Sequence, residues 1–214
     1  MKTPFTLEQF LEVFKNYNLT VWPMQVVFYL LAIAVIFFSL KKFIYSNPVI
    51  NIILSFFWLW IGVVYHIIYF SGINKAAYVF GGIFILHGFI FLFYGVFKSK
   101  ISFHFRYDIN NIIGALMILY ALIVYPFLGY FLGHRYPYSP TFGLPCPTTI
   151  FTFGILLTAN RKVPVLVLII PVIWSVIGFF AAISFGILED TGLLVSGILA
   201  AILILRNNKY QENN

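Results

Sequence analysis

Charged side chains are scarce in this sequence. They make up 9% of its 214 residues, whereas 62% of the residues are hydrophobic and 21% are aromatic. An ordinary soluble domain has about 25% charged and about 45–50% apolar residues, and a soluble fold of this composition could not cover its apolar surface with polar groups. The composition therefore excludes a soluble globular enzyme, a disordered chain and a disulfide-stapled secreted domain, and it indicates a small integral membrane protein.

Cysteine and catalytic motifs are scarce as well. The single cysteine, Cys146, cannot form a disulfide within the chain. The sequence contains no HExxH, no P-loop, no GxSxG and no paired Cys/His metal spacing. We therefore do not expect an enzyme, although an intramembrane site built from scattered residues stays open.

Seven apolar runs occupy most of the chain. A transmembrane helix needs about 20 residues, and helices satisfy their own backbone polar groups in lipid. We predict an all-α integral membrane protein, a bundle of about seven transmembrane helices that forms one domain over residues 21–206. Small residues such as Gly81, Gly178 and Gly186 are expected to let helices pack closely, and they permit a homo-oligomer without requiring one. The runs are Trp22–Leu40, Pro48–Phe70, Ala76–Phe97, Ile109–Phe131, Thr148–Ala159, Pro164–Leu188 and Gly192–Leu205.

The two ends of the chain are more polar than its middle. In residues 1–20, Thr6 and Gln9 fit a capping box and apolar residues recur at helical spacing. This pattern predicts a short amphipathic helix along the membrane surface or over the mouth of the bundle. Residues 207–214 are expected to form a polar, frayed cytoplasmic tail.

The net charge of +7 does not indicate a nucleic-acid partner, because the basic residues lie in the short gaps between apolar runs. With seven spans, one set of gaps holds nine of the 13 Lys and Arg residues and the other set holds four. Basic residues are enriched on the cytoplasmic side, so we expect the N-terminus outside and the C-terminus in the cytoplasm. The nine are Lys41, Lys42, Lys98, Lys100, Arg106, Arg161, Lys162, Arg206 and Lys209, and the four are Lys2, Lys15, Lys75 and Arg135.

The fifth run, Thr148–Ala159, is too short to cross a membrane alone. Its 12 residues would span roughly 18 Å as a helix, against a hydrocarbon core about 30 Å thick. Residues 133–149 contain four prolines and two glycines, which block a regular helix. Either the helix begins further out, near Phe142, and is distorted, or irregular chain dips inward and the helix begins partway down. We favour the second, a broken or re-entrant fifth segment, because broken helices recur at binding sites in membranes.

The start of that short helix is a candidate site. Pro147 suits the first helical turn, and the free N–H groups of this turn form a positive pole that attracts an anion, a thiolate or a polar ligand. Cys146 precedes it and is a possible nucleophile or soft-metal ligand, and Thr148 and Thr149 add hydroxyls. The alternative is that Cys146 is an inert buried residue and that the prolines shape an external loop.

Further ionisable residues fall on the same side of the membrane. Glu189 and Asp190 precede the short seventh run, which would draw them below the outer interface, where acids mark functional sites. The alternative for them is a solvated turn with a helix cap. Together with the histidines they predict an outward-facing polar pocket under the N-terminal helix. Its predicted ligand-binding residues are His66, His87, His134, Arg135, Cys146, Thr148, Thr149, Glu189 and Asp190.

These features predict a membrane-embedded permease or binding protein for a small solute or ion. Cys146 and His134 are candidate ligands for a soft metal such as copper, zinc or mercury. A second possibility is a redox or haem-binding membrane protein that uses His66 and His87. A third is a structural or accessory subunit, which would show an exposed packing face and no internal cavity. The seventh run contains no lysine for a Schiff base, which excludes a retinal protein.

Several long strings resemble those of a known family. They are QFLEVFKNYN, VWPMQ, GVVYHIIYFSGIN, LGHRYPYSPTFGLPCPTTIFTFG and IPVIWSVIGFFAAISFGILED. Together they are similar to a bacterial multi-pass membrane protein family that is carried as a domain of unknown function, and the resemblance runs over most of the chain. It implies a prokaryotic inner-membrane protein, and it brings no catalytic or binding residues with it.

Overall fold

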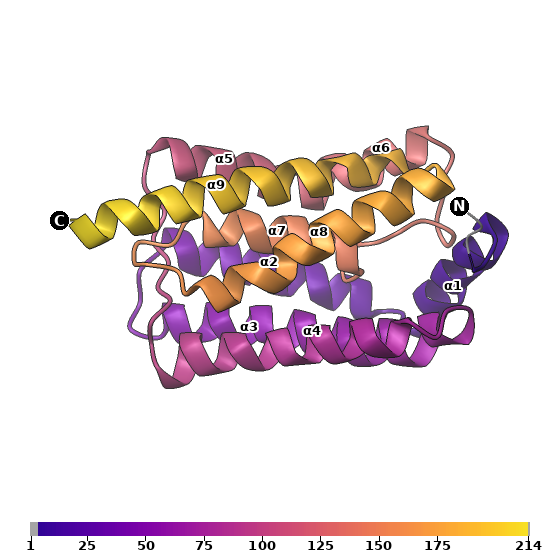
Figure 1. The fold of residues 1–214 in the computed structure, drawn as a ribbon, viewed down its shortest axis with the longest axis horizontal. Helices are drawn as coiled ribbons and strands as arrows, with labels where there is room; N and C mark the ends of the chain where they lie inside the picture. The colour runs from indigo at the N-terminus through magenta and orange to yellow at the C-terminus, as the bar shows by residue number, and fades with distance from the viewer. Residues whose placement is uncertain (1–3, 214) are drawn as a thin grey trace.

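The computed structural model describes residues 4–213, which form helices and connecting loops without a β-strand (Figure 1). Helix α1 (Leu7–Thr20) lies across one end of a bundle of elongated helices, and we call this the α1 end. The chain finishes at the opposite end, which we call the C-terminal end. The bundle consists of α2 (Met24–Leu40), α3 (Ser46–Trp60) with η1 (Ile61–Tyr69) and η2 (Phe70–Gly72), α4 (Ala77–Phe91) with η3 (Leu92–Phe97), α5 (Ile109–Leu119) with η4 (Tyr120–Val124) and α6 (Tyr125–Phe131), α7 (Pro145–Leu156), α8 (Val165–Phe185), and η5 (Leu188–Asp190) with α9 (Thr191–Asn213).

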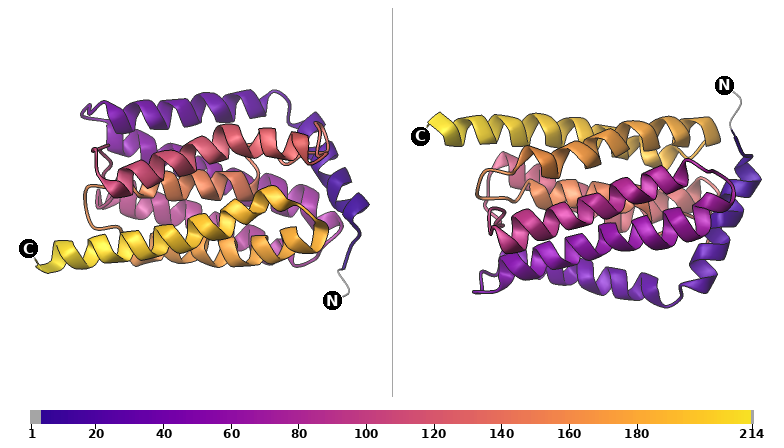
Figure 2. Two further views of the ribbon diagram at one scale, coloured as in Figure 1. Left: turned by 90° about the horizontal axis from the view of Figure 1, so that it is seen from above. Right: turned by 60° about the horizontal axis from the view of Figure 1, so that its bottom comes forward.

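Helix α1 forms where the sequence predicts it. The capping box is present, since Thr6 Oγ1 accepts from the backbone N–H of Gln9 at 3.2 Å and Gln9 Oε1 accepts from the N–H of Thr6 at 2.9 Å. The apolar face buries Val13 and Phe14 against the bundle. The axis of α1 is bent by 82° from that of α2, so α1 covers the end of the bundle instead of extending it (Figure 2).

All seven predicted apolar runs contain a helix, but seven membrane crossings do not follow from them. By length and composition, five helices can cross a membrane, and a sixth crossing results only if the bent pair of α1 and α2 is counted as one span. Alone, α2 has 17 residues and α7 has 12. The five are Ser46–Gly72, Ala77–Phe97, Ile109–Phe131, Val165–Phe185 and Leu188–Glu212.

The short fifth segment is the central helix of the bundle. Helix α7 begins at Pro145, three residues earlier than the predicted run, because prolines are tolerated where the first turn needs no N–H donor. Every residue of α7 except Cys146 is buried. A helix that is apolar on all sides is a buried one, and neighbouring helices enclose α7 from its first turn to its last.

The chain before α7 turns inward. Residues 133–139 are mostly exposed, whereas Pro140 and residues 142–145 are buried. Side chains of α1 hold this irregular segment: the Asn18 amide donates to the carbonyls of Pro137 and Ser139 at 2.7 and 2.8 Å, and its Oδ1 accepts from the Thr141 hydroxyl at 2.8 Å. Backbone polar groups of a buried irregular segment need hydrogen-bond partners, and Asn18 supplies two of them. The inward path therefore depends on α1.

Glycines bring several helices into backbone contact. A Cβ atom on Gly114 of α5 would lie 2.6 Å from the carbonyl oxygen of Gly154 in α7, and one on Gly154 would lie 2.7 Å from the carbonyl oxygen of Gly114. Gly81 likewise faces Gly62, as its predicted packing role requires. Gly186 does not: nothing lies within 4 Å of its Cβ position, and with a φ of 72° it ends α8 instead.

The C-terminal end differs from the prediction in one respect. The expected frayed tail, residues 207–214, is helical as far as it is described, because α9 continues to Asn213. The buried Asn208 side chain explains this, since it exchanges two hydrogen bonds of 2.9 and 2.8 Å with the backbone of Val163. Four of the nine basic residues assigned to one side surround a single hollow at this end, namely Lys98, Lys100, Arg161 and Lys162.

The close contact between Gly114 and Gly154 predicts that a larger side chain at either position lowers the stability of the protein. We expect Gly154→Ala to lower the stability by about 1–3 kcal/mol, because the added methyl group must push α5 away from α7. Gly82→Ala is the matched control, since nothing lies within 4 Å of that Cβ position in α4. Thermal unfolding of both variants in detergent tests this, and an equal midpoint for the two would contradict the packing described.

The hydrogen bonds of Asn18 predict a local effect. Asn18→Ala leaves two backbone carbonyls without their donor, at a cost of about 1–3 kcal/mol. Residues 133–144 should then exchange amide hydrogens faster, while α9 should not change. Hydrogen–deuterium exchange with mass spectrometry measures this, and unchanged exchange in residues 133–144 would show that α1 does not hold the segment.

Candidate functional site: a pocket beneath the N-terminal helix

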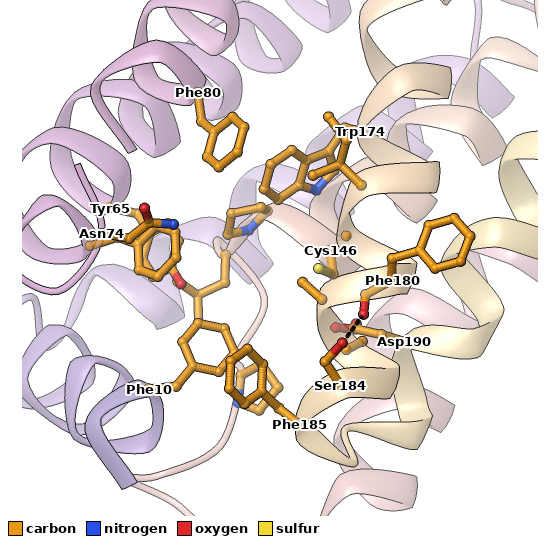
Figure 3. Close-up of a pocket in the computed structure, with 18 of the residues that line it drawn as sticks. Phe10, Tyr65, Asn74, Phe80, Cys146, Trp174, Phe180, Ser184, Phe185 and Asp190 are labelled. Carbon is orange, nitrogen blue, oxygen red and sulfur yellow. Dashed lines mark hydrogen bonds between the residues drawn. The ribbon is translucent and has the colours of Figure 1, made fainter. Parts of the chain in front are cut away.

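A pocket lies at the α1 end, between α1, the segment around η1 and α4, the first turn of α7, and α8 (Figure 3). Its volume is about 290 Å³, close to the lower end of the usual range for ligand pockets, about 300–1,000 Å³. Phe10 and Phe14 of α1 line it together with Phe5. The N-terminal helix thus forms the roof, as the sequence predicts, but the lining is mostly apolar and not polar.

Aromatic rings from distant parts of the chain close the roof. Phe5 stacks on Phe185 of α8 with 4.9 Å between ring centroids, and it meets Phe70 of η2 edge-on at 5.5 Å. Phe10 lies 5.3 Å from Phe185 and 5.7 Å from Phe70. Because aromatic pairs at these distances add packing energy beyond their buried area, the roof ties α1 to α8 and η2.

One row of exposed residues forms the rim of the pocket on α8. Ile177, Phe180, Ala181 and Ser184 all line the pocket, and all four are exposed. Their spacing of three, four and seven residues places them on one face of the helix. This part of the rim therefore lies on the side of the bundle.

The floor of the pocket contains Cys146. It is the one residue of α7 that is only half-buried, and its thiol lies beside Trp174 and Asp190 (Figure 3). A Cβ atom on Gly178 would lie 3.4 Å from Trp174 Nε1 and 3.6 Å from Cys146 Sγ, so the glycine leaves both atoms uncovered. Trp174 Nε1 is buried and has no hydrogen-bond partner. The floor therefore carries an unused donor.

Asp190 completes the floor. Its side chain is 5% exposed, and its Oδ1 accepts a hydrogen bond of 2.5 Å from the hydroxyl of the buried Tyr125. Tyr125 directly follows η4, and Asp190 is the last residue of η5, so two separate segments bring this pair together. The predicted approach of Cys146 and Asp190 is thus present.

Glu189, the neighbour of Asp190, faces a different group. Its Oε1 lies 2.8 Å from His134 Nδ1, and its backbone carbonyl accepts from the Tyr120 hydroxyl at 2.6 Å. Gly129 makes room for it, because a Cβ atom there would lie 3.0 Å from Glu189 Oε1. The buried Glu189 and the half-buried His134 therefore form a polar pair that does not line the pocket.

Three further predicted residues do not line the pocket. Arg135 is exposed and lies 4.9 Å above the ring of Tyr130. Thr148 Oγ1 accepts from the N–H of Gly143 at 3.2 Å, and the Thr149 hydroxyl donates to the carbonyl of Pro145 at 2.7 Å. Both hydroxyls thus satisfy the backbone at the start of α7 instead of facing a ligand.

Two further predicted residues, His66 and His87, are buried among aromatic rings. Neither ring nitrogen of His66 or His87 has a hydrogen-bond partner. The His66 ring lies 4.7 Å from Phe84, Phe84 lies 4.6 Å from Trp58, and Trp58 lies 4.1 Å from His87. Phe84 and Trp58 thus link the two imidazoles, where a haem held by both would need space for its own ring. The contacts do not favour the haem hypothesis.

The described residues also give little support to a metal site. Between residues 4 and 213, no group of three His, Cys, Asp or Glu side chains is placed to hold a metal ion. His134 pairs with Glu189, and Cys146 lies beside Asp190 and Trp174. The predicted soft-metal ligands Cys146 and His134 therefore have no third ligand in this part of the chain.

Sequence reasoning missed most of the pocket wall. Tyr65, Phe80 and Trp174 line it, and Tyr125 supports its floor. Tyr65 lies in η1, a π-helical stretch, and Tyr125 follows a second one, η4. Such π-helical stretches often occur at functional sites, but no residue pattern in the sequence predicted them. The only available signal was the number of aromatic residues near the outer ends of the runs.

Comparison with known proteins gives one result. No curated protein and no solved structure matches the chain. A family of unknown function, DUF6064, matches residues 7–214. That match agrees with the resemblance to an uncharacterised family and assigns no activity. The chain belongs to the DUF6064 family.

Proposed function

We propose that this protein is a membrane-embedded binding protein or permease for a small solute, and that the pocket under α1 is its binding site. The observation that carries the proposal is a hollow of about 290 Å³ whose floor holds the indole N–H of Trp174 and the carboxyl group of Asp190. Trp174 Nε1 has no partner, and Asp190 meets the hydroxyl of Tyr125 and the thiol of Cys146 but no basic side chain among the described residues.

Unpaired buried polar groups need an explanation. Leaving a buried donor or acceptor unsatisfied costs about 1–3 kcal/mol, and such groups in a folded protein commonly meet a ligand or water. A mostly apolar pocket with a few converging polar groups is the usual form of a small-molecule site. The cavity also argues against a purely structural subunit, for which we expected none.

Binding has more support than passage through the protein. The pocket ends at the first turn of α7, and the rest of that helix is buried on all sides. Release of a solute from the pocket to the opposite side of the membrane requires α7 and α8 to separate. Pro171 lies inside α8, one turn before Trp174, and a proline inside a helix removes a hydrogen bond and bends it. We propose this turn as the place where α8 moves.

The proposed location is the inner membrane of a prokaryotic cell, with the α1 end outside. The support is the distribution of basic residues, since Lys98, Lys100, Arg161 and Lys162 from separate loops gather at the C-terminal end. Basic residues favour the cytoplasmic side. In this orientation a solute reaches the pocket from the outer half of the bilayer.

The lone cysteine permits a test that needs no known ligand. Because Cys146 is half-buried at the pocket floor, N-ethylmaleimide should label it in the folded protein. Ala181→Trp, on the exposed rim, should slow the labelling at least tenfold by filling the entrance. Intact-mass spectrometry measures the rate, because only one site can react.

Ile183→Trp is the matched control. Ile183 is equally on α8 and 51% exposed, but it does not line the pocket. Its labelling rate should equal that of the wild type. The proposal fails if Cys146 reacts only after denaturation, or if Ala181→Trp and Ile183→Trp label at the same rate.

The orientation is tested with reporters fused to the C-terminal residue. Green fluorescent protein, which matures in the cytoplasm, should fluoresce there, and alkaline phosphatase, which needs an oxidising compartment, should be inactive. Active alkaline phosphatase at that position would reverse the orientation and place the pocket on the cytoplasmic side.

A further inference from the structure

We propose that the pocket selects a small organic cation, such as a quaternary ammonium compound, with Asp190 as its counter-charge and the surrounding aromatic rings as its cage. This inference rests on the proposed binding function and names the class of ligand. It comes from the charge of the floor and the chemistry of the walls.

Asp190 has no cation of its own within the described residues. Among residues 4–213 the ion pairs of lysine and arginine are Lys15–Glu12 and Lys162–Glu212, and His134 lies against Glu189. None of the side chains that interact with Asp190 is a Lys or Arg; they are Tyr125, Cys146, Tyr65, Tyr120 and Glu189. A buried carboxylate is costly unless an opposite charge accompanies it or it takes up a proton. A cation in the pocket would supply that charge.

The basic residues of the α1 end that the structure describes are engaged elsewhere. Lys15 pairs with Glu12 at 2.7 Å, Lys75 lies 5.9 Å from the ring of Tyr78, and Arg135 lies 4.9 Å from the ring of Tyr130. None of the three lines the pocket. Among the described residues, no basic side chain is therefore placed to balance a negative charge on Asp190.

The walls suit a cation with apolar substituents. Phe10, Phe70 and Phe185 line the pocket. Tyr65, Phe80 and Trp174 line it as well, and Figure 3 shows these three together with Phe10 and Phe185 around the hollow. The faces of aromatic rings attract cations, and aromatic cages are the usual means of recognising quaternary ammonium groups. Trp174 Nε1, which lacks a partner, would donate to an oxygen of the same ligand.

Other ligand classes fit less well. An anion would meet Asp190 without a basic side chain to offset the repulsion. A bare metal ion needs several donor groups, and the described residues offer no cluster of three. A neutral apolar molecule would fill the aromatic part and offer no partner to Asp190. The volume of about 290 Å³ restricts the cation to a small one.

The test compares the rates at which three methanethiosulfonate reagents modify Cys146. One is neutral, one carries a trimethylammonium group and one carries a sulfonate, and each rate is divided by the rate with the denatured protein. We expect the cationic reagent to be favoured over the anionic one at least tenfold. In Asp190→Asn this ratio should fall close to one, while any change in the reactivity of the thiol itself cancels from the ratio.

A protection experiment uses the unmodified protein and does not depend on how the variant folds. Choline should slow the reaction of Cys146 with the neutral reagent, and its uncharged isostere 3,3-dimethylbutan-1-ol should not. If the neutral reagent labels folded protein but the charge ratio is near one, or both compounds protect equally, the cation inference is wrong and the binding site stands. If the neutral reagent labels only the denatured protein, the proposed function itself fails.

Discussion

The pocket depends on the contact between α1 and the irregular chain that precedes α7. The amide N–H groups of Asn18 donate to two backbone carbonyls of that chain, and its side-chain oxygen accepts a hydrogen bond from a threonine hydroxyl. Tyr17 donates to the carbonyl of Gly143 at 3.3 Å. In lipid these backbone groups would have no water as a partner. By satisfying them, α1 allows the chain to turn inward, α7 to begin below the end of the bundle, and a hollow to remain between the two.

The adjacent acids Glu189 and Asp190 point in different directions and meet different partners. Glu189 turns toward α6 and is paired with His134, whereas Asp190 turns toward the pocket and meets Tyr125. Both are buried. The first is a structural pair, and the second leaves a carboxylate at the edge of an apolar cavity. The proposed chemistry of the site follows from this difference.

Local features were predictable from the sequence. The capping box at Thr6 and Gln9 was predictable because it needs only residues within one turn. The short helix after the prolines was predictable because each proline restricts its own stretch of backbone. The roof of Phe5, Phe70 and Phe185 was not predictable, since its rings come from three distant segments. The fate of each acid likewise depends on Gly129 and Tyr125, which only the fold brings near.

The position of Cys146 tests the central claim most directly. A nitroxide attached to Cys146 in bilayers reports its depth through the ratio of its collisions with oxygen and with a water-soluble nickel complex. The account predicts a deeper position than that of the same label at residue 138 in a Cys146→Ser, Tyr138→Cys variant, with little access to nickel. Equal depth and equal access to nickel at the two positions would place residues 133–146 outside the bilayer and remove the pocket as a membrane site.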